Sequence, residues 1–302
     1  MTLVSVIIPT YNRSDLLPRA IDSVLKQTVD DFELIIVDDC SEDNTSEVVK
    51  RYNDKKIKFI SHSKNQGGSA ARNTGIKHAD GDYIAFLDSD DEWMPRKLEF
   101  QVKCLESRSD EWAAVYCGTR GVRHGKTKTI RKIIGNVIGE NPNSVHGKEG
   151  GEEVIVDILM TNLKHGGAST IMAKSDIVRE INGFDESFQR QQDWEFLIRL
   201  LKVKKMAYVD QNLVITHETG YPSSDSLKES KSKLFGKFKG DIKYAESAGY
   251  PVRDAHLFEL SRVYLRENNF RKGIGHLPSK TLSFRQYLQL SREIIEGLMQ
   301  KL

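Results

Sequence analysis

The sequence has few of the features that would mark a secreted, membrane-spanning or metal-cluster protein. Its 302 residues contain only 3 cysteines, Cys40, Cys104 and Cys117, at no metal-ligand spacing. An odd and small cysteine count favours buried thiols in a reducing compartment over a disulfide framework. No apolar run approaches the ~18 residues of a membrane span, and the N-terminus lacks a basic segment followed by a cleavage site. We therefore expect a cytoplasmic protein whose N-terminus is a strand.

Excess charge of one sign is also missing, which argues against a nucleic-acid partner. The net charge is +2, but it is unevenly spread: from Asp225 onwards there are 15 Lys and Arg against 9 Asp and Glu. Lysines alternate there with apolar residues at helical spacing, most clearly in residues 223–248. This pattern is typical of a helix on anionic lipid, and equally of a solvated helix packed on its own domain. We predict a basic helical extension over residues 223–302, with peripheral contact to the inner face of the membrane or a homodimer as its open roles.

The first hundred residues alternate between strand and helix patterns. Short apolar, β-branched runs end at proline, glycine or acidic residues, and segments with apolar residues at helical spacing separate them. The expected strands are residues 3–8, 32–37, 57–60 and 82–87. This order predicts a parallel sheet with right-handed helical crossovers. Residues 118–150 lose the apolar pattern, and we expect a hairpin or loop over the site there.

Polar residues follow three of these strands at the point where each strand ends. They are residues 9–12, the pair Asp38 and Asp39, and the acidic run 88–91. The carboxyl ends of parallel strands share one edge, where open α/β sheets bind ligands. Clustered carboxylates suit hard cations such as Mg²⁺ or Mn²⁺, so the pattern favours a metal–diphosphate site. The alternative is an acidic turn before a helix that begins at Pro95, and we interpret Asp91 as a cap for that helix.

Four motifs in this order resemble the inverting family 2 glycosyltransferases with the GT-A fold. The motifs are residues 4–12, 36–41, 65–73 and 87–91. The resemblance is close over residues 1–100 and looser as far as residue 217. It implies an α/β fold of the GT-A type, Rossmann-like, with a mostly parallel central sheet and flanking helices. The implied domain is residues 1–222, with a nucleotide-binding half (1–110) and an acceptor and catalytic half (111–222).

The resemblance also implies roles for single residues around the donor. The residues that match the nucleotide pocket are Pro9, Thr10, Tyr11, Asp39, Arg72 and Asp88. Asp39 would accept a hydrogen bond from the base, which favours uracil because its N3–H is a donor. Asp90 would ligate Mn²⁺ or Mg²⁺ bridging the diphosphate, with Asp88 and His217 as further candidate ligands. For Arg72 a structural salt bridge remains an alternative, and His217 has a structural alternative too.

In the second half, the resemblance points to two further segments. The Gly-rich turn at 166–172 would contact the donor sugar through Gly167 and Ala168. Residues 191–196 match the stretch that carries the family's catalytic base, so Asp193 is the candidate. Gln192 and Trp194 beside it would contact donor or acceptor sugar. Asp193 would take the proton of an acceptor hydroxyl as that oxygen attacks the sugar. A helix N-terminus favours an Asp without any catalysis, and this stays the alternative.

The sequence thus favours an inverting, metal-dependent glycosyltransferase that moves a sugar from a nucleotide sugar, most simply a UDP-sugar. The acceptor would be a glycan or lipid-linked hydroxyl in surface polysaccharide, lipid-linked or protein glycan assembly. A sugar nucleotidyltransferase would need a Gly-rich phosphate loop after the first strand, and residues 9–13 contain no glycine. A non-catalytic scaffold of the same fold is the other alternative. The presence of the full acidic set argues against it: Asp39, Asp88, Asp90 and Asp193.

Overall fold

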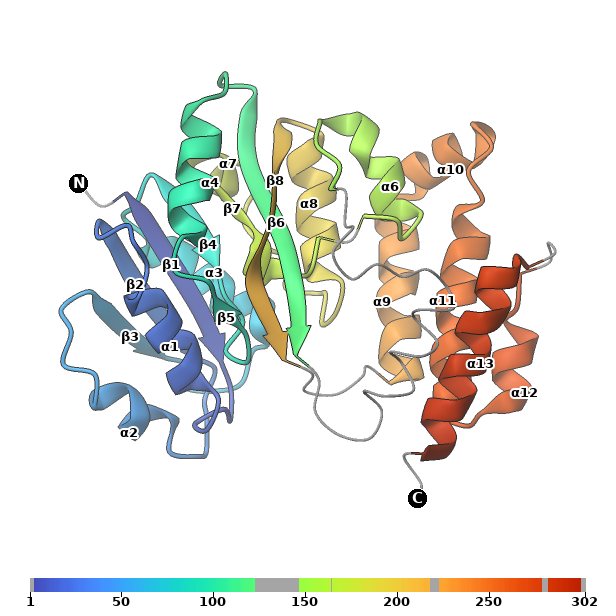
Figure 1. The fold of residues 1–302 in the computed structure, drawn as a ribbon, viewed down its shortest axis with the longest axis horizontal. Helices are drawn as coiled ribbons and strands as arrows, with labels where there is room; N and C mark the ends of the chain where they lie inside the picture. Colours follow the sequence, from blue (N-terminus) through green and yellow to red (C-terminus); the bar gives the residue numbers. More distant parts are fainter. Residues whose placement is uncertain (1–2, 123–146, 164, 218–222, 279–281, 300–302) are drawn as a thin grey trace. The chain divides into compact units, whose positions relative to one another are not determined.

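The computed structural model describes residues 3–122, 147–163, 165–217, 223–278 and 282–299. The chain divides into two compact units (Figure 1). The first is built from Met1–Val122, His146–Ile155 and Lys164–His217, and the rest of the chain belongs to the second. The predicted domain boundary between residues 222 and 223 stays a prediction.

The first unit is built on one mixed sheet, whose order in the described residues is β3-β2-β1-β4-β7-β6-β8-β5. Strands β1 to β4 pair in parallel, as do β6 and β8, whereas β7 runs antiparallel to both its neighbours and β5 antiparallel to β8. This arrangement confirms the predicted α/β class. The strands are β1 (Val4–Thr10), β2 (Phe32–Asp38), β3 (Ile57–Ser61), β4 (Tyr83–Phe86), β5 (Glu92–Trp93), β6 (Trp112–Val122), β7 (Met172–Lys174) and β8 (Lys205–His217).

Helices cover both faces of this sheet, which explains why its strands are continuous apolar runs. Alternate residues of β1, such as Val6 and Ile8, join a core with α1 and α4, while Ile7 packs on α3 from the other face (Figure 1). The helical segments of this unit are α1 (Leu17–Leu25), α2 (Thr45–Lys50), α3 (Gly68–His78), α4 (Lys97–Glu106), η1 (Glu152–Val154), η2 (Ala168–Thr170), α7 (Ser175–Glu180) and α8 (Gln192–Leu201). A short helix, α6 (Ile155–Leu159), continues η1.

Several boundaries differ from the sequence expectation. The helix expected from Pro95 begins at Lys97, so the proline lies just before it. The two short strands expected at 206–209 and 213–216 form the single strand β8. Strand β6 extends to Val122, and the remainder of the expected 118–150 loop lies mostly outside the described residues.

The second unit is helical in its described part, which confirms the predicted helical C-terminal region. Its helices are α9 (Ser224–Lys237), α10 (Lys239–Ser247), α11 (Val252–Arg266), α12 (Phe270–Gly275) and α13 (Phe284–Met299). The basic stretch at 223–248 forms two helices because Phe238 leaves the helical conformation, with φ −106° and ψ 32°. Leu227 of α9 packs against Leu260, Val263 and Tyr264 of α11.

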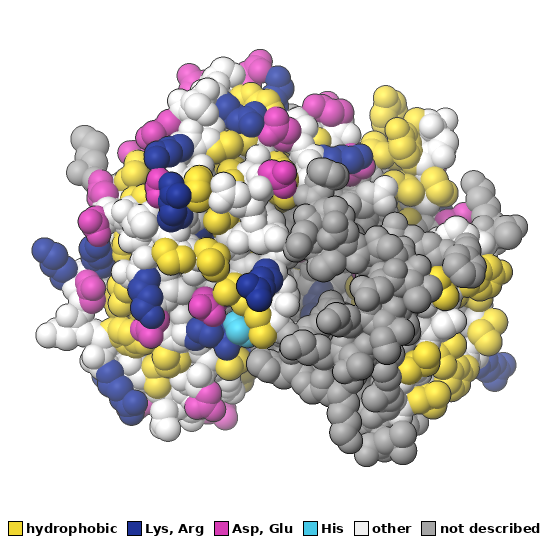
Figure 2. Space-filling model, viewed as in Figure 1, with side chains coloured by type: hydrophobic (Ala, Val, Ile, Leu, Met, Phe, Trp, Pro, Cys, Tyr) yellow, Lys and Arg dark blue, Asp and Glu magenta, His cyan; other side chains and the backbone are white. Residues whose placement is uncertain are grey.

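The surface of this unit carries exposed apolar side chains. They include Tyr244 on α10, Ile274 on α12, and Tyr287 and Leu298 on α13. Figure 2 shows apolar side chains at the surface of this unit. Among the described helices, none combines the length and apolar character needed to cross a membrane. Peripheral membrane contact and homodimer formation through residues 223–302 stay predictions.

Candidate active site

The ends of β1 and β2 are joined by hydrogen bonds between the two loops that follow them. The backbone N–H of Asp39 donates to the carbonyl of Thr10 at 2.8 Å, and that of Asn12 donates to Ser41 Oγ at 2.8 Å. Pro9 lies in register with Val37. Thr10 is buried while Tyr11 is 43% exposed, so one side chain is fixed in the sheet and the next faces solvent.

Asp39 is buried at this edge, where its carboxylate holds the turn that leads into α3. Its oxygens accept the backbone N–H of Gln66 at 2.9 Å and of Gly67 at 2.7 Å, and one of them lies 2.8 Å from His62 Nδ1. Gly67 has φ +92°, a conformation that favours glycine. The neighbouring Asp38 accepts the backbone N–H of Ser41 at 3.2 Å and so supports its own loop.

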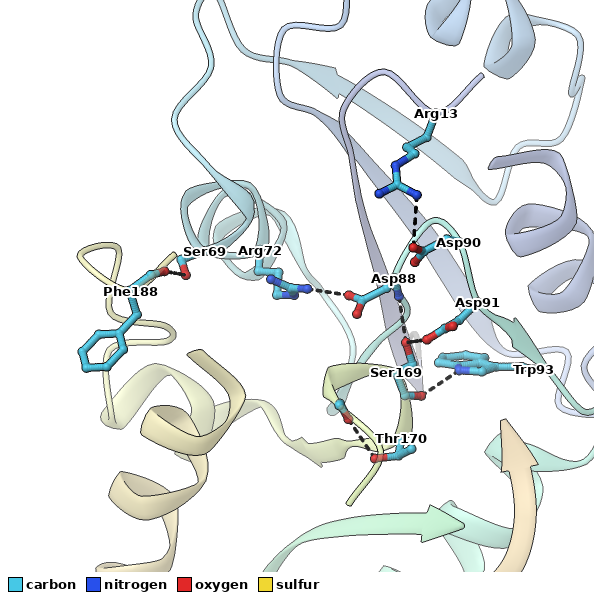
Figure 3. A network of polar contacts seen from close by, with 11 residues as sticks. Arg13, Ser69, Arg72, Asp88, Asp90, Asp91, Trp93, Ser169, Thr170 and Phe188 are labelled. Atoms are coloured by element: carbon cyan, nitrogen blue, oxygen red, sulfur yellow. Dashed lines mark hydrogen bonds and ion pairs between the residues drawn. The ribbon is translucent and has the colours of Figure 1, made fainter. Parts of the chain in front are cut away.

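Each of the two carboxylates predicted to bind metal or donor faces an arginine (Figure 3). Arg72 from α3 pairs with Asp88, and Arg13 Nη1 lies 3.1 Å from Asp90 Oδ2. Arg19 donates to the backbone carbonyl of Asp90 at 2.6 Å. The repulsion expected between closely spaced carboxylates is therefore offset by cations from two other segments.

The interpretation of Asp91 as a helix cap is wrong. The residue before α4 is Arg96, and that helix has no side-chain cap. Asp91 is instead buried, and it accepts Ser169 Oγ at 2.6 Å and the backbone N–H of His217. Burial, with the nearby Asp88 carboxylate, raises the pKa of Asp91 to about 7. Asp91 thus ties the acidic loop to two distant segments.

His217 reaches the acidic loop because β8 pairs with β5. Glu92 lies in register with Ile215, and His217 Nε2 is 3.5 Å from Glu92 Oε2. The sheet therefore places a residue more than a hundred positions away next to Glu92 and Asp91, at the end of the acidic loop.

The turn at 165–170 lies between two acidic groups of the site, the acidic loop at 88–91 and the candidate base Asp193. Its two glycines, Gly166 and Gly167, have φ +75° and +86°. On one side, Ser169 Oγ accepts the backbone N–H of Asp88 at 3.0 Å and donates to the Asp91 carboxylate (Figure 3). On the other side, His165 Nε2 lies 3.6 Å from Asp193 Oδ2. Ala168 in this turn is buried.

Asp193 lies in the first turn of α8, next to Gln192, which contacts Arg72 of the nucleotide-binding half. With its amide oxygen facing Arg72, Gln192 accepts from Arg72 Nη1 at 2.8 Å. Arg72 therefore lies between Asp88 and the start of α8. Asp193 keeps part of its side chain exposed, at 19%, and Trp194 is partly buried. Glu195 is fully buried, and its carboxylate accepts the Nε–H of Arg199 at 2.5 Å. This ion pair is structural.

The predicted metal ligands fit a divalent ion that shares its coordination with a diphosphate. Carboxylate and imidazole donors suit Mg²⁺ or Mn²⁺. Across the part of the chain that the structure describes, no three His, Cys, Asp or Glu side chains are grouped closely enough to hold a metal alone. Mg²⁺ commonly uses one or two carboxylates and completes its shell with water and substrate phosphates. Asp88 and Asp90, two positions apart in the acidic loop, could supply those one or two carboxylates.

Three residues at this site were not found from the sequence. Arg13 follows the Tyr-Asn pair of the first loop and faces Asp90. Ser169 and His165 belong to a turn whose glycines were noticed, but their partners are 78 and 28 positions away. The available signal was the position of both residues in a turn built on paired glycines, because such turns bring polar side chains close to a neighbouring backbone.

Comparison with known proteins finds relatives among glycosyltransferases. The family model described as "Glycosyl transferase family 2" matches residues 5–180. The chain is 30% identical to the amylovoran biosynthesis glycosyltransferase AmsB of Erwinia amylovora, over 99% of this chain and 96% of that protein. It is 30% identical to the Escherichia coli glucosyltransferase WfgD, over 76% of this chain and 83% of that one. It spans only 63% of another relative, the uncharacterized glycosyltransferase RT0329 of Rickettsia typhi, at 32% identity over 70% of this chain.

Solved structures agree on the fold. Staphylococcus aureus TarS 1–349 in complex with UDP-GlcNAc matches with a TM-score of 0.58 and 16% identity, covering 99% of this chain and 92% of that one. The mannosyltransferase PcManGT of Pyrobaculum calidifontis, in complex with GDP-Man and Mn²⁺, matches with a TM-score of 0.57 and 17% identity over 99% of this chain and 88% of that one. Both likenesses confirm the GT-A architecture. Because the family model covers more than half of its length, the chain belongs to glycosyl transferase family 2.

Proposed function

We propose that this protein is an inverting, metal-dependent glycosyltransferase that moves a sugar from a UDP-sugar to a hydroxyl of a growing surface glycan. The observation that carries the proposal is the turn at 165–170. It contacts Asp88 and Asp91 through Ser169 and approaches Asp193 through His165, so one donor sugar held there would meet both acidic groups.

The donor side of the proposal rests on the strand ends. Asp39 Oδ2 accepts one backbone N–H, and a carboxylate oxygen can accept a second donor such as the uracil N3–H. The exposed ring of Tyr11 would pack on the base, with Pro9 and Thr10 forming the floor of the pocket. TarS, with UDP-GlcNAc, and WfgD, whose name specifies UDP-Glc, support a uridine donor, whereas PcManGT carries GDP-Man.

Asp90 would hold the divalent ion, with Asp88 and His217 in support. Such an ion neutralises charge on a departing diphosphate. Arg13 and Arg72, which face these carboxylates in the structure, are long enough to turn toward phosphate oxygens and orient them.

Asp193 would act on the acceptor side as the general base. An acceptor hydroxyl must lose its proton as its oxygen attacks the anomeric carbon, and a partly exposed carboxylate within hydrogen-bond reach can take it. Attack from the face opposite the diphosphate inverts the configuration of the sugar. The names of WfgD and AmsB support an acceptor in bacterial polysaccharide assembly, either a lipid-linked sugar or a glycan.

A binding experiment tests the metal and donor assignment. Calorimetry should show Mn²⁺-dependent UDP binding that EDTA weakens, and Asp90→Ala should reduce the affinity by about 10-fold or more. Asp110→Ala is the matched control, because that carboxylate is fully exposed and pairs only at the surface with Lys174. UDP binding that is equal with and without EDTA in both variants would remove the metal from the proposal.

A transfer experiment tests the base. Asp193→Asn should keep UDP-sugar binding and lose roughly 10²–10⁴-fold in turnover. Asp176→Asn is the control, because Asp176 also lies in the first turn of a helix but on α7. Full turnover in Asp193→Asn would place the base elsewhere.

A further inference from the structure

We propose that His165 is a positioning residue for Asp193: it holds one carboxylate oxygen so that the other faces the acceptor hydroxyl. The inference rests on the proposed function, since it assumes that Asp193 is the base. His165 is 3% exposed and Asp193 is 19% exposed, so the imidazole lies on the protein side of a carboxylate that solvent can reach.

The proton on His165 is directed toward Asp193 by the turn itself. The backbone N–H of Gly167 donates to His165 Nδ1 at 3.2 Å, so the neutral ring carries its hydrogen on Nε2. Nε2 is the atom 3.6 Å from Asp193 Oδ2. The backbone of His165 is also held in place, because Thr170 Oγ1 donates to its carbonyl oxygen at 2.5 Å.

At 3.6 Å the two atoms are close enough for electrostatic attraction but too far for a hydrogen bond. Contacts of this kind are often long without substrate and shorten in the productive complex. An acceptor hydroxyl that donates to the free oxygen of Asp193 would leave the other oxygen to His165 Nε2–H. The carboxylate would then have one defined orientation, and the glycines that shape the donor turn would also set the direction of the base.

Two substitutions separate this role from a structural role in the turn. In Asn the polar side-chain atoms lie at the same number of bonds from Cβ as Nδ1 of histidine. In Gln they lie at the same number of bonds as Nε2. His165→Asn therefore keeps the acceptor for Gly167 N–H and loses the contact with Asp193. His165→Gln keeps a donor toward Asp193 and loses the acceptor in the turn.

The assay is UDP release from UDP-GlcNAc and UDP-glucose in Mn²⁺, with water as the acceptor, together with calorimetric UDP affinity. His165→Asn should lower turnover by about 10-fold, the value of one lost hydrogen bond to a charged group, without changing UDP affinity. His165→Gln should remain within about 3-fold of the wild type. The opposite order, with Gln impaired and Asn normal, would mean that His165 only supports the turn and would overturn the inference.

A spectroscopic readout does not depend on turnover. In ¹⁵N spectra of the 8 histidines, His165→Asn identifies the His165 signals. Asp193→Asn should then shift the Nε2 resonance of His165 and leave Nδ1 in place, and an unchanged Nε2 would overturn the inference. If Asp193→Asn kept full turnover, the base proposed above would be wrong. If Asp193→Asn lost turnover and His165→Asn did not, only the role of His165 would fall.

Discussion

Ser169→Ala is the substitution that should most directly uncouple the acidic loop from the rest of the site. The Ser169 side chain is fully buried, and its hydroxyl makes two hydrogen bonds at once. It accepts the backbone N–H of Asp88 at 3.0 Å and donates to Asp91 Oδ2 at 2.6 Å. Alanine removes both bonds without adding volume, so the effect reports on the hydroxyl alone.

The magnitude follows from what is left unpaired. At pH 8 Asp91 is ionised, and a hydrogen bond to a charged group contributes about 1.5–3 kcal/mol. The partly buried N–H of Asp88 adds about 1 kcal/mol when it loses its acceptor. We therefore expect the free energy of unfolding of the first unit to fall by about 3 kcal/mol, which is about 6–12 °C in Tm for a domain of this size.

Scanning calorimetry at pH 8 measures this change, and UDP titration in Mn²⁺ should show weaker binding in the same variant. Ser107→Ala is the matched control, because its exposed hydroxyl makes one bond to the Cys104 carbonyl and its loss should cost no more than about 0.5 kcal/mol. A Tm for Ser169→Ala within about 2 °C of the wild type would refute the reasoning, since ~1 kcal/mol corresponds to at least that shift.

Three further outcomes follow from buried groups. Burial, aided by the Lys231 ammonium, lowers the pKa of His256 to about 4. The unfolded chain then binds more protons than the folded one between about pH 4 and pH 6.5. The free energy of unfolding of the second unit should therefore fall by up to ~3 kcal/mol on acidification across that window, as measured by urea unfolding. His256→Gln should make this free energy less dependent on pH. Gly75→Ala places a Cβ 2.5 Å from Ile7 Cγ2 and should cost about 1–3 kcal/mol in Tm-derived stability; an unchanged Tm would mean that α3 can shift on β1. Glu195→Ala should lower the free energy of unfolding by about 3–5 kcal/mol, because it leaves the Arg199 guanidinium on the same helix without its buried carboxylate partner. Urea unfolding no different from the wild type would contradict this.

The acidic loop shows what a single sequence can predict. Asp88 and Asp90 follow an apolar strand, and parallel topology alone brings such residues to one sheet edge. How deeply each carboxylate is buried does not follow from the strand pattern in the same way. Asp91 has the same chemistry and the next position, yet it is buried under Ser169 rather than placed at a helix terminus.

The other features that the sequence did not predict depend on contacts between segments that are distant in the sequence. The parallel half of the sheet was predicted because each of its strands is a separate apolar run. The pairing of β5 with β8, which brings His217 to the loop, involves a strand of only 2 residues and leaves no periodic signal. The contact of His165 with Asp193 likewise depends on a turn and a helix that local pattern cannot place together.

The distribution of the site along the chain has a consequence for how the protein folds. Its groups come from β1, near the start of the sequence, and from β8, which ends more than two hundred positions later. Contacts between such distant segments carry a high loop-closure entropy and form late in folding. The order of events should therefore be collapse of the parallel half first and docking of β8 afterwards. Nucleotide binding during refolding should then begin with the first four strands, whose ends carry Pro9, Asp39 and Asp88, and His217 should join the site only when β8 docks.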